Sequence, residues 1–273
     1  MSNTLFIRRL VALASLLWLV VISGALQAQT KPTRTDVGGE NANSFLWVGN
    51  SFFYYNNSMH SHVGNLTRAA NPKTGYRAVS VTISGAGIDW HDMEAYFRPN
   101  GIGKYSFVGN NEIVFNKSGK QFDAVIVMDC SQCPIHPQLK SVFQEYAKRD
   151  SEIILRNGAR PILFMSWAYK DKPEMTAQLA EQYTIAGNAN DALVIPAGLA
   201  FAKATVKRPD IELYQSDKRH PSLLGTYLAA CTVYAATTKK SPVGNTYTAG
   251  IDPALAGLLQ ATAWETIQEY YAK

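Results

Sequence analysis

The sequence has 273 residues, of which 47% are hydrophobic, and it carries a formal net charge of +5 at pH 7. Residues 29–273 fit the size of one large α/β domain with an ample core, and no low-complexity linker or block of charge divides them. Residues 1–28 contain two arginines and no acidic residue, so residues 29–273 have a net charge of +3. This charge is too small to indicate a nucleic-acid partner.

Residues 1–28 have the layout of a secretory signal peptide. Two arginines precede an apolar run at residues 10–22, and small residues follow it. A membrane span needs about 20 apolar residues, so this shorter run favours cleavage over a retained membrane anchor. We therefore predict an exported protein, periplasmic or secreted. Residues 29–43 are polar and glycine-rich, and they predict a mobile leader ahead of a domain at residues 44–273.

The domain begins with a short apolar run, which predicts a strand buried on both faces, as in a parallel sheet covered by helices. This run ends at Gly49, and Asn50 and Ser51 follow it directly. A serine at the end of a strand fits two roles, a turn residue and a nucleophile. The local sequence leaves both roles open.

Four later segments resemble this first strand, and they begin at Arg77, Phe122, Arg160 and Asp191. Helical patterns lie between several of them, at residues 59–70, at 138–157 before Gly158, and at 174–185 with a stop at Gly187. This alternation predicts a three-layer α/β sandwich, with a mainly parallel sheet of about five strands between layers of helices. Ligands bind at the carboxyl ends of such strands, an edge shared by Ser51, Gly85 and Gln132.

Two further elements are predicted outside this alternation. Residues 104–116 fit a hairpin that turns at Gly109, Asn110 and Asn111. Residues 253–271 carry leucine and other apolar residues at helical spacing, so we predict a helix that covers the core.

Cys130 and Cys133 form a C-x-x-C motif after the third strand. A redox dithiol would occupy such a position, and so would a disulfide that stiffens the loop carrying Gln132. The chain lacks the length and order of a thioredoxin-like protein, which favours the disulfide. Cys231 lies on the apolar face of a predicted helix and fits packing.

His220 stands apart from the other four histidines because a carboxylate lies at a spacing that one turn of chain can bridge. Asp217 precedes it by three residues in a polar loop, and Pro221 follows it, where we predict the first position of a long apolar helix. A serine hydroxyl becomes a nucleophile when an imidazole takes its proton and a carboxylate orients that imidazole. The pair therefore favours the nucleophile over the turn residue for Ser51.

At these positions the chain resembles the SGNH hydrolases, also called the GDSL family, over nearly all of the mature length. The segment "VGNS" matches the family's G-D-S or G-N-S block, and "SDKRHPS" matches its D-x-x-H block. The resemblance implies the SGNH fold, which is flavodoxin-like, with Ser51 as nucleophile and Asp217 and His220 as acid and base. It also implies an oxyanion hole built by the backbone of Ser51 and Gly85, with Gly87 as an alternative to Gly85.

The third oxyanion position departs from the family pattern. The family has G-x-N-D after the third strand, whereas this chain has "MDCSQCP", which places Gln132 where the family has asparagine. Glutamine is also an amide donor but is one methylene longer, and the missing glycine makes the loop backbone less permissive. This variant, together with "MSWAYKD" and "HPSLLGTYLAAC", resembles a subgroup of the family.

The resemblance implies a secreted serine ester hydrolase that cleaves short acyl esters through an acyl-enzyme, with acetyl groups on carbohydrate as the favoured substrate. Three alternatives stay open: a lipid or thioester hydrolase, a glycan O-acyltransferase on the same triad, and a binding domain without activity. Several aromatic residues fit both packing and a substrate cleft, namely Phe53, Tyr54, Tyr55, Trp167 and Tyr169.

Neither a metal nor an organic cofactor is predicted. His60 and His62 do not share a helical face, and no second pair of ligands has suitable spacing. The expected partner is a small-molecule or glycan ester, and the sequence leaves the oligomeric state open.

Overall fold

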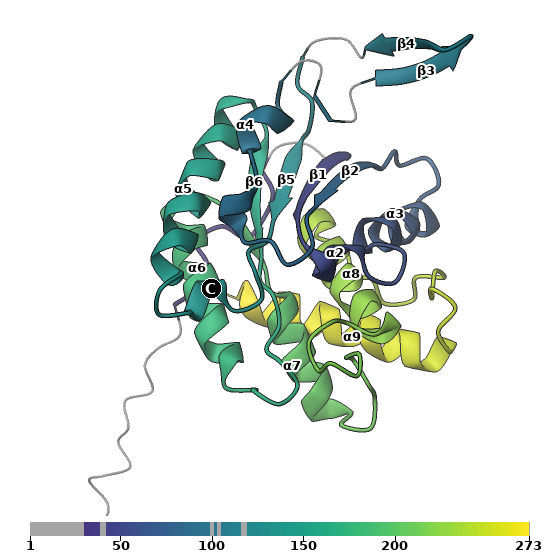
Figure 1. The fold of residues 1–273 in the computed structure, drawn as a ribbon. Coiled ribbons are helices and arrows are strands. Elements are labelled where there is room, and N and C mark those ends of the chain that lie inside the picture. The colour runs from purple at the N-terminus through teal and green to yellow at the C-terminus, as the bar shows by residue number, and fades with distance from the viewer. Residues whose placement is uncertain (1–29, 39–41, 99–100, 103–104, 116–118, 273) are drawn as a thin grey trace, which may run out of the picture. The chain divides into compact units, whose positions relative to one another are not determined.

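Five parallel strands form the central sheet of the domain (Figure 1). Their spatial order is β2 (Arg77–Thr82), β1 (Ser44–Gly49), β5 (Ala124–Val127), β6 (Arg160–Phe164) and β7 (Leu193–Ile195). The computed structural model describes residues 30–38, 42–98, 101–102, 105–115 and 119–272, so the predicted signal peptide lies outside the described residues. From Lys31 on, the described residues belong to one compact unit.

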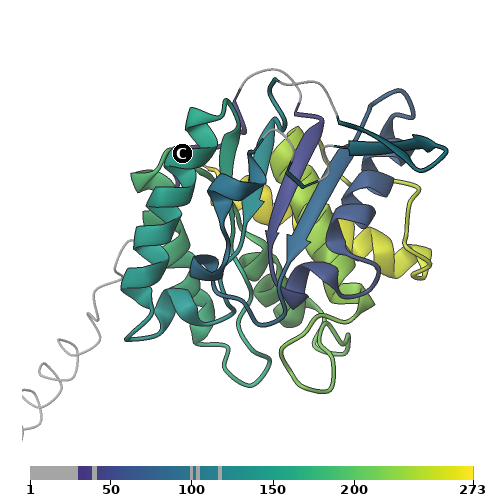
Figure 2. The same ribbon diagram turned by 45° about the horizontal axis from the view of Figure 1, so that its top comes forward.

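Helices cover both faces of this sheet (Figures 1 and 2). One face packs against α3 (Met59–Ala70), α7 (Ala197–Lys207), α8 (Leu223–Thr238) and α9 (Pro253–Tyr270). The other face packs against α4 (Met93–Tyr96), α5 (Lys140–Arg156) and α6 (Met175–Ala189). The predicted three-layer α/β sandwich is therefore confirmed.

Successive residues of the strands supply the two cores alternately. In β1, Phe45 and Trp47 lie in the core with α8, whereas Leu46 and Val48 lie in the core with α5. This follows from the strand geometry, in which neighbouring side chains point to opposite faces. It explains why β1, β5 and β7, which are buried along their whole length, are almost continuously apolar, whereas the partly exposed edge strand β2 also carries polar residues.

Two predicted helix boundaries are wrong. Gly187 does not end α6, which continues to Ala189. A Cβ atom at Gly187 would lie 2.3 Å from Cγ2 of Val194, so the glycine allows the helix to approach β7 closely. Pro221 is not the first residue of α8, because Ser222 caps this helix and accepts a hydrogen bond from the backbone N–H of Gly225.

The described part of the predicted leader makes specific contacts. Arg34 forms an ion pair with Asp191, and the backbone N–H of Thr33 donates to Oδ1 of Asn188 at 2.8 Å. Asp36 pairs with Lys239 at 3.0 Å. Residues 30–38 thus differ from the mobile leader that their composition suggests. Their charged and polar groups form ion pairs and hydrogen bonds with the domain.

The predicted hairpin is confirmed as β3 (Tyr105–Gly109) and β4 (Glu112–Phe115), which pair antiparallel. Gly109, Asn110 and Asn111 at its turn all have positive φ, a conformation that glycine and asparagine adopt most readily. The hairpin lies far from α2 (Ser51–Tyr54) (Figure 1). None of the described helices combines the length and apolar character that a membrane crossing requires.

Candidate active site

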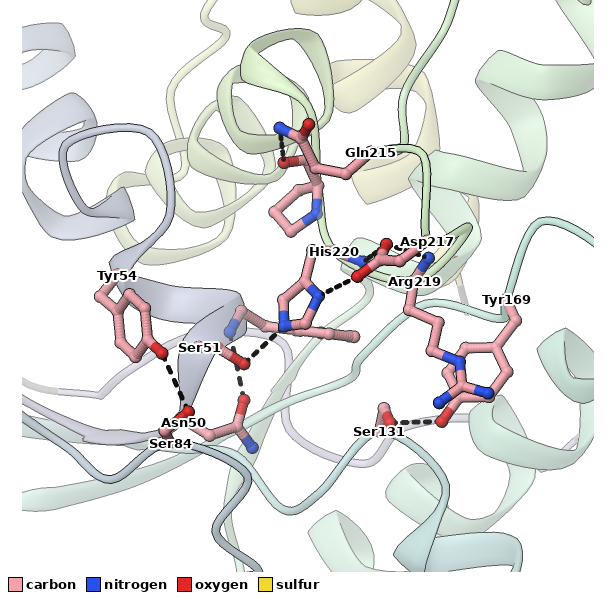
Figure 3. Close-up of polar contacts among 12 residues, drawn as sticks. Asn50, Ser51, Tyr54, Ser84, Ser131, Tyr169, Gln215, Asp217, Arg219 and His220 are labelled. Carbon is pink, nitrogen blue, oxygen red and sulfur yellow. Dashed lines mark hydrogen bonds and ion pairs between the residues drawn. The ribbon is translucent and has the colours of Figure 1, made fainter.

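Ser51 lies where β1 ends and the short helix α2 begins. Asn50 caps this helix, since its Oδ1 accepts a hydrogen bond from the backbone N–H of Phe52 at 3.2 Å. The Oγ atom of Ser51 lies 2.8 Å from Nε2 of His220, within hydrogen-bond distance (Figure 3). Ser51 is only 7% exposed, so its hydroxyl is directed to the imidazole by the surrounding chain.

His220 is held in turn by Asp217. The Nδ1 atom of His220 is hydrogen-bonded to Oδ2 of Asp217, and Oδ1 of Asp217 accepts from the backbone N–H groups of Arg219 and His220 at 2.9 and 3.0 Å. Serine, imidazole and carboxylate therefore follow one another in a single hydrogen-bonded chain (Figure 3).

The loop that carries the histidine and the aspartate closes on itself. Tyr214 and Pro221 form an isolated antiparallel bridge, and the backbone N–H of Gln215 donates to the carbonyl of His220 at 2.8 Å. We call residues 214–221 the acid–base loop. This closure holds the backbone of Asp217 and His220 in one short segment.

Asp217 is stabilised as a carboxylate. Burial raises the pKa of Asp217, but the hydrogen bond from His220 and the two backbone N–H donors outweigh that effect. The pKa of Asp217 consequently lies below its ordinary value. The carboxylate is thus ionised at neutral pH and able to orient the Nδ1–H tautomer of the imidazole.

Aromatic rings support the imidazole from two sides. The ring of Tyr55 stacks on His220 with centroids 4.3 Å apart, and the edge of Phe52 meets the same imidazole at 5.5 Å. Trp167 stacks on Phe52 at 4.6 Å, and its Nε1–H donates to the carbonyl of Arg219 at 2.9 Å. These contacts leave the imidazole little freedom to rotate.

Backbone donors lie at two neighbouring strand ends. Gly85, in the turn after β2, has a φ of 73°, which is unfavourable for residues with a side chain. Among the described residues, the backbone N–H groups of Ser51 and Gly85 have no hydrogen-bond acceptor. Both groups are therefore available to an oxyanion. Gly87 instead precedes the short helix η1 (Ile88–Trp90) with extended backbone.

The Asn50 side chain joins these strand ends. Its Nδ2 donates to the carbonyl of Ala86 at 3.0 Å and to the carbonyl of Asp129 at 3.2 Å. One amide thus fixes the start of α2 at Ser51, the Gly85 turn and the loop after β5 to one another. The bonds to Ala86 and Asp129 cannot be predicted from the sequence, although the position of Asn50 before a helix is a signal for an N-cap.

Gln132 is the predicted third oxyanion donor, in the loop after β5. It is exposed, and its side chain forms no hydrogen bond with any described residue, Ser51 and Gly85 included. The disulfide between Cys130 and Cys133 is present and closes the loop that carries it. A contribution of Gln132 to an oxyanion hole therefore stays a prediction.

The same loop has a cluster of possible metal ligands. Ligand atoms of Asp129, Cys130 and Cys133 lie within 4.8 Å of one another. The two sulfurs are joined in the disulfide, so they lack the thiolate charge through which cysteine binds metals. Burial raises the pKa of Asp129 to about 6, despite backbone donors from Ile88 and Cys130.

Three solved structures share this fold at low sequence identity. A DUF4886 family protein from Bacteroides uniformis is 18% identical, with 84% of this chain and 96% of that chain covered and a TM-score of 0.57. A protein from Slackia heliotrinireducens, described provisionally as an SGNH hydrolase, is 21% identical, with coverages of 72% and 99% and a TM-score of 0.52. The third, TesA, is 14% identical, with coverages of 71% and 97% and a TM-score of 0.50.

These similarities establish the fold of the domain. The Slackia heliotrinireducens protein, described provisionally as an SGNH hydrolase, has the same fold. No protein-family model matches the chain, and no curated protein matches it. What the domain does must therefore be argued from its own residues.

Proposed function

We propose that this chain is a serine ester hydrolase in which Ser51, His220 and Asp217 form the catalytic triad. The observation that carries the proposal is the continuous hydrogen-bonded chain from Ser51 Oγ through the imidazole to Asp217. It lies at the carboxyl edge of a parallel sheet, where ligands bind in folds of this kind. The shared fold supports the same interpretation by analogy.

The geometry supports acylation of Ser51. With the Nδ1–H of His220 held by Asp217, Nε2 accepts the proton of Ser51 while Oγ attacks the ester carbonyl. The backbone N–H groups of Ser51 and Gly85 stabilise the negative charge that develops on the carbonyl oxygen. The imidazolium then donates its proton to the departing alcohol, which leaves an acyl group on Ser51.

Water completes the cycle by the same route in reverse. His220 takes a proton from a water molecule, which attacks the acyl carbonyl, and Ser51 leaves with the proton restored to Oγ. Each step moves protons between imidazole and one of serine, the departing alcohol or the attacking water. Gln132 is proposed as a third oxyanion donor, through its side-chain amide.

We further propose short acyl esters of carbohydrate as substrates of an exported enzyme. Trp90 is 62% exposed and lies next to His91, whose Nε2 is 3.1 Å from the carbonyl of Gly49 at the end of β1. Trp90 thus lies on the turn that follows β2, at the edge of the sheet where ligands bind, and its exposed ring offers a flat face on which a sugar ring can pack. Lipid or thioester hydrolysis, acyl transfer to a glycan and binding without catalysis are the competing functions.

Hydrolysis of 4-nitrophenyl acetate by wild type and Ser51→Ala tests the triad. We expect the variant to lose at least about a thousandfold in kcat, as is typical when a triad serine is removed. Ser216→Ala is a matched control, since this serine is exposed in the acid–base loop and makes no side-chain hydrogen bond with a described residue. Equal activity of wild type and Ser51→Ala would overturn the proposed triad.

A substrate screen separates the competing functions. We expect Ser51-dependent release of acetate from acetylated glycans, with rates that fall as the acyl chain of 4-nitrophenyl esters lengthens. Acylated glycan formed from an added ester donor would indicate the transferase instead. Turnover of long-chain or thioester substrates included in the screen, in preference to acetyl esters, would indicate the lipid or thioester hydrolase. Inactivity of the wild type on every ester and thioester in the screen would favour the binding domain.

A further inference from the structure

Arg219 precedes the proposed catalytic histidine directly, and its main chain is fixed on both sides. Its N–H donates to Oδ1 of Asp217 at 2.9 Å, and its carbonyl accepts from Nε1 of Trp167 at 2.9 Å. Trp167 is fully buried, so this second contact ties Arg219 to the core. The side chain therefore starts from a defined point beside the imidazole.

The guanidinium group of Arg219 lies over the ring of Tyr169, with Cζ 4.8 Å from the ring centroid. Tyr169 is only 5% exposed, and its hydroxyl is hydrogen-bonded to Oγ of Ser131 at 2.7 Å. The side chain extends from the acid–base loop along Tyr169 toward Ser131, in the loop after β5 (Figure 3). A buried, hydrogen-bonded ring is a rigid support for a cation, and stacking leaves the N–H edge of the guanidinium free.

The charge of Arg219 is not neutralised by the protein. Arg219 is exposed, and among the described residues no carboxylate forms an ion pair with it. The two neighbouring lysines differ in this respect, since Lys218 pairs with Asp171 at 3.3 Å and Lys170 pairs with Glu212. Within the acid–base loop, Arg219 is thus the cationic side chain for which the described residues supply no carboxylate partner.

Asp89 is the exposed acidic residue on the turn that follows β2, at the same edge of the sheet. It makes no ion pair with Arg219 within the described part of the chain. The positive charge therefore stays available to a ligand.

We propose that the substrate is an ester that also carries a carboxylate, and that Arg219 binds this carboxylate. The inference rests on the proposed ester hydrolase activity and specifies its substrate class. A guanidinium matches a carboxylate with two parallel hydrogen bonds, which makes the contact directional as well as attractive. An acyl ester of an acidic sugar, or of a dicarboxylic acid, has the required chemistry.

The test compares kcat/KM within two matched pairs of esters. The first pair places the carboxylate on the alcohol side, in acetylated methyl glucuronide against acetylated methyl glucoside. The second places it on the acyl side, in mono-4-nitrophenyl succinate against 4-nitrophenyl butyrate. We expect wild type to prefer the acidic member of at least one pair by about tenfold, the size of a typical charged hydrogen bond.

Variants assign this preference to Arg219. We expect Arg219→Gln to bring the ratio of the two kcat/KM values close to one, and Arg219→Lys to keep part of it. Lys218→Gln is the control, because it removes a neighbouring charge that is already paired with Asp171. Its ratio of kcat/KM values should match that of the wild type. A ratio taken on a single preparation does not depend on the fraction of enzyme that is folded. Raising the ionic strength should lower the ratio for wild type but not for Arg219→Gln.

Three results would overturn the inference. The first is equal hydrolysis by wild type of both members of both pairs, and the second is an unchanged preference in Arg219→Gln. Both leave the proposed hydrolase intact, because Ser51-dependent turnover is still measured. The third is a lack of Ser51-dependent turnover on all four esters, which would overturn the proposed function as well.

Discussion

Asn50 connects more of the candidate site than any residue that the sequence analysis singled out. It accepts from Phe52 N–H at the start of α2 and donates to the carbonyls of Ala86 and Asp129. Asn50 is 4% exposed, so loss of this amide would leave two buried carbonyls without their partner. Its contribution to catalysis would be to position the backbone donors, since its hydrogen bonds go to Phe52, Ala86 and Asp129 and not to Ser51 Oγ.

We predict that Asn50→Ala lowers kcat on 4-nitrophenyl acetate by about tenfold to a hundredfold, less than direct loss of an oxyanion donor. Asn50→Asp should be equally impaired, because a carboxylate keeps the acceptor for Phe52 but loses both donors. Asn65→Ala on α3 is the matched control. Full kcat in Asn50→Asp would show that the donors are not needed.

At the level of single residues, the sequence predicts the serine, histidine and aspartate but not their surroundings. Ser51 could be recognised because it follows a buried strand, and Asp217 and His220 because three residues separate them. The stacking of Tyr55 and the exposure of Gln132 could not be predicted, because they depend on side-chain directions that loop conformation sets. The unpaired charge of Arg219 likewise depends on where distant acidic side chains lie.

At the level of elements, the glycine at position 187 allows α6 to pack closely against β7. A Cβ atom at Gly187 would approach the side chain of Val194 to 2.3 Å and the carbonyl of Ala192 to 3.1 Å. Helix α6 would have to move outward to accept it. By contrast, a Cβ atom at Gly257 in α9 would meet no atom within 4 Å.

We predict opposite effects of alanine at these two helical glycines. Gly187→Ala should lower the free energy of unfolding by roughly 1–3 kcal/mol, the usual cost of overpacking. Gly257→Ala should raise it by about 0.5–1 kcal/mol, because alanine loses less backbone entropy in a helix. Urea denaturation measures both values. A neutral or stabilising Gly187→Ala would contradict the close approach of α6 to β7.

Strands were easier to predict than helix ends because a continuous apolar run has few alternatives in a covered sheet. Helix α7 was missed because the apolar run of β7 continues into it without a polar break, so periodicity does not separate the two. The end of α6 was misplaced because glycine signals a helix stop and a close packing contact alike.

Two buried carboxyl groups make the stability of the whole molecule depend on pH. Burial raises the pKa of Asp150 to about 7 and that of Asp129 to about 6, although the charge of Arg149 opposes the shift at Asp150. Oδ2 of Asp150 has no hydrogen-bond partner among the described residues. Both folded-state pKa values exceed the unfolded value of about 4, so the folded state binds protons more tightly.

The sign of the effect follows from this difference. The contribution of these two carboxyl groups to stability should fall as the pH rises from about 4 through 7, because their ionisation costs more in the folded state than in the unfolded chain. Three histidines act in the opposite sense, since burial lowers the pKa of His60, His62 and His91. We predict that Asp150→Asn raises the free energy of unfolding at pH 8, on the order of 2–4 kcal/mol, and changes it much less at pH 4. Denaturation at both pH values, with Glu152→Gln on the exposed side of α5 as control, measures this. An equal gain in the free energy of unfolding of Asp150→Asn at pH 4 and pH 8 would contradict the raised pKa of Asp150.

The closed acid–base loop has a consequence for biosynthesis. His220 and Asp217 lie in the acid–base loop, whereas the serine that they would activate lies 169 residues before the histidine in the sequence. A nascent chain whose synthesis has not reached Asp217 has its nucleophile but no base, so under the proposed mechanism it cannot cleave esters. Activity would then appear only once the acid–base loop docks on α2, which makes ester turnover a reporter of completed folding.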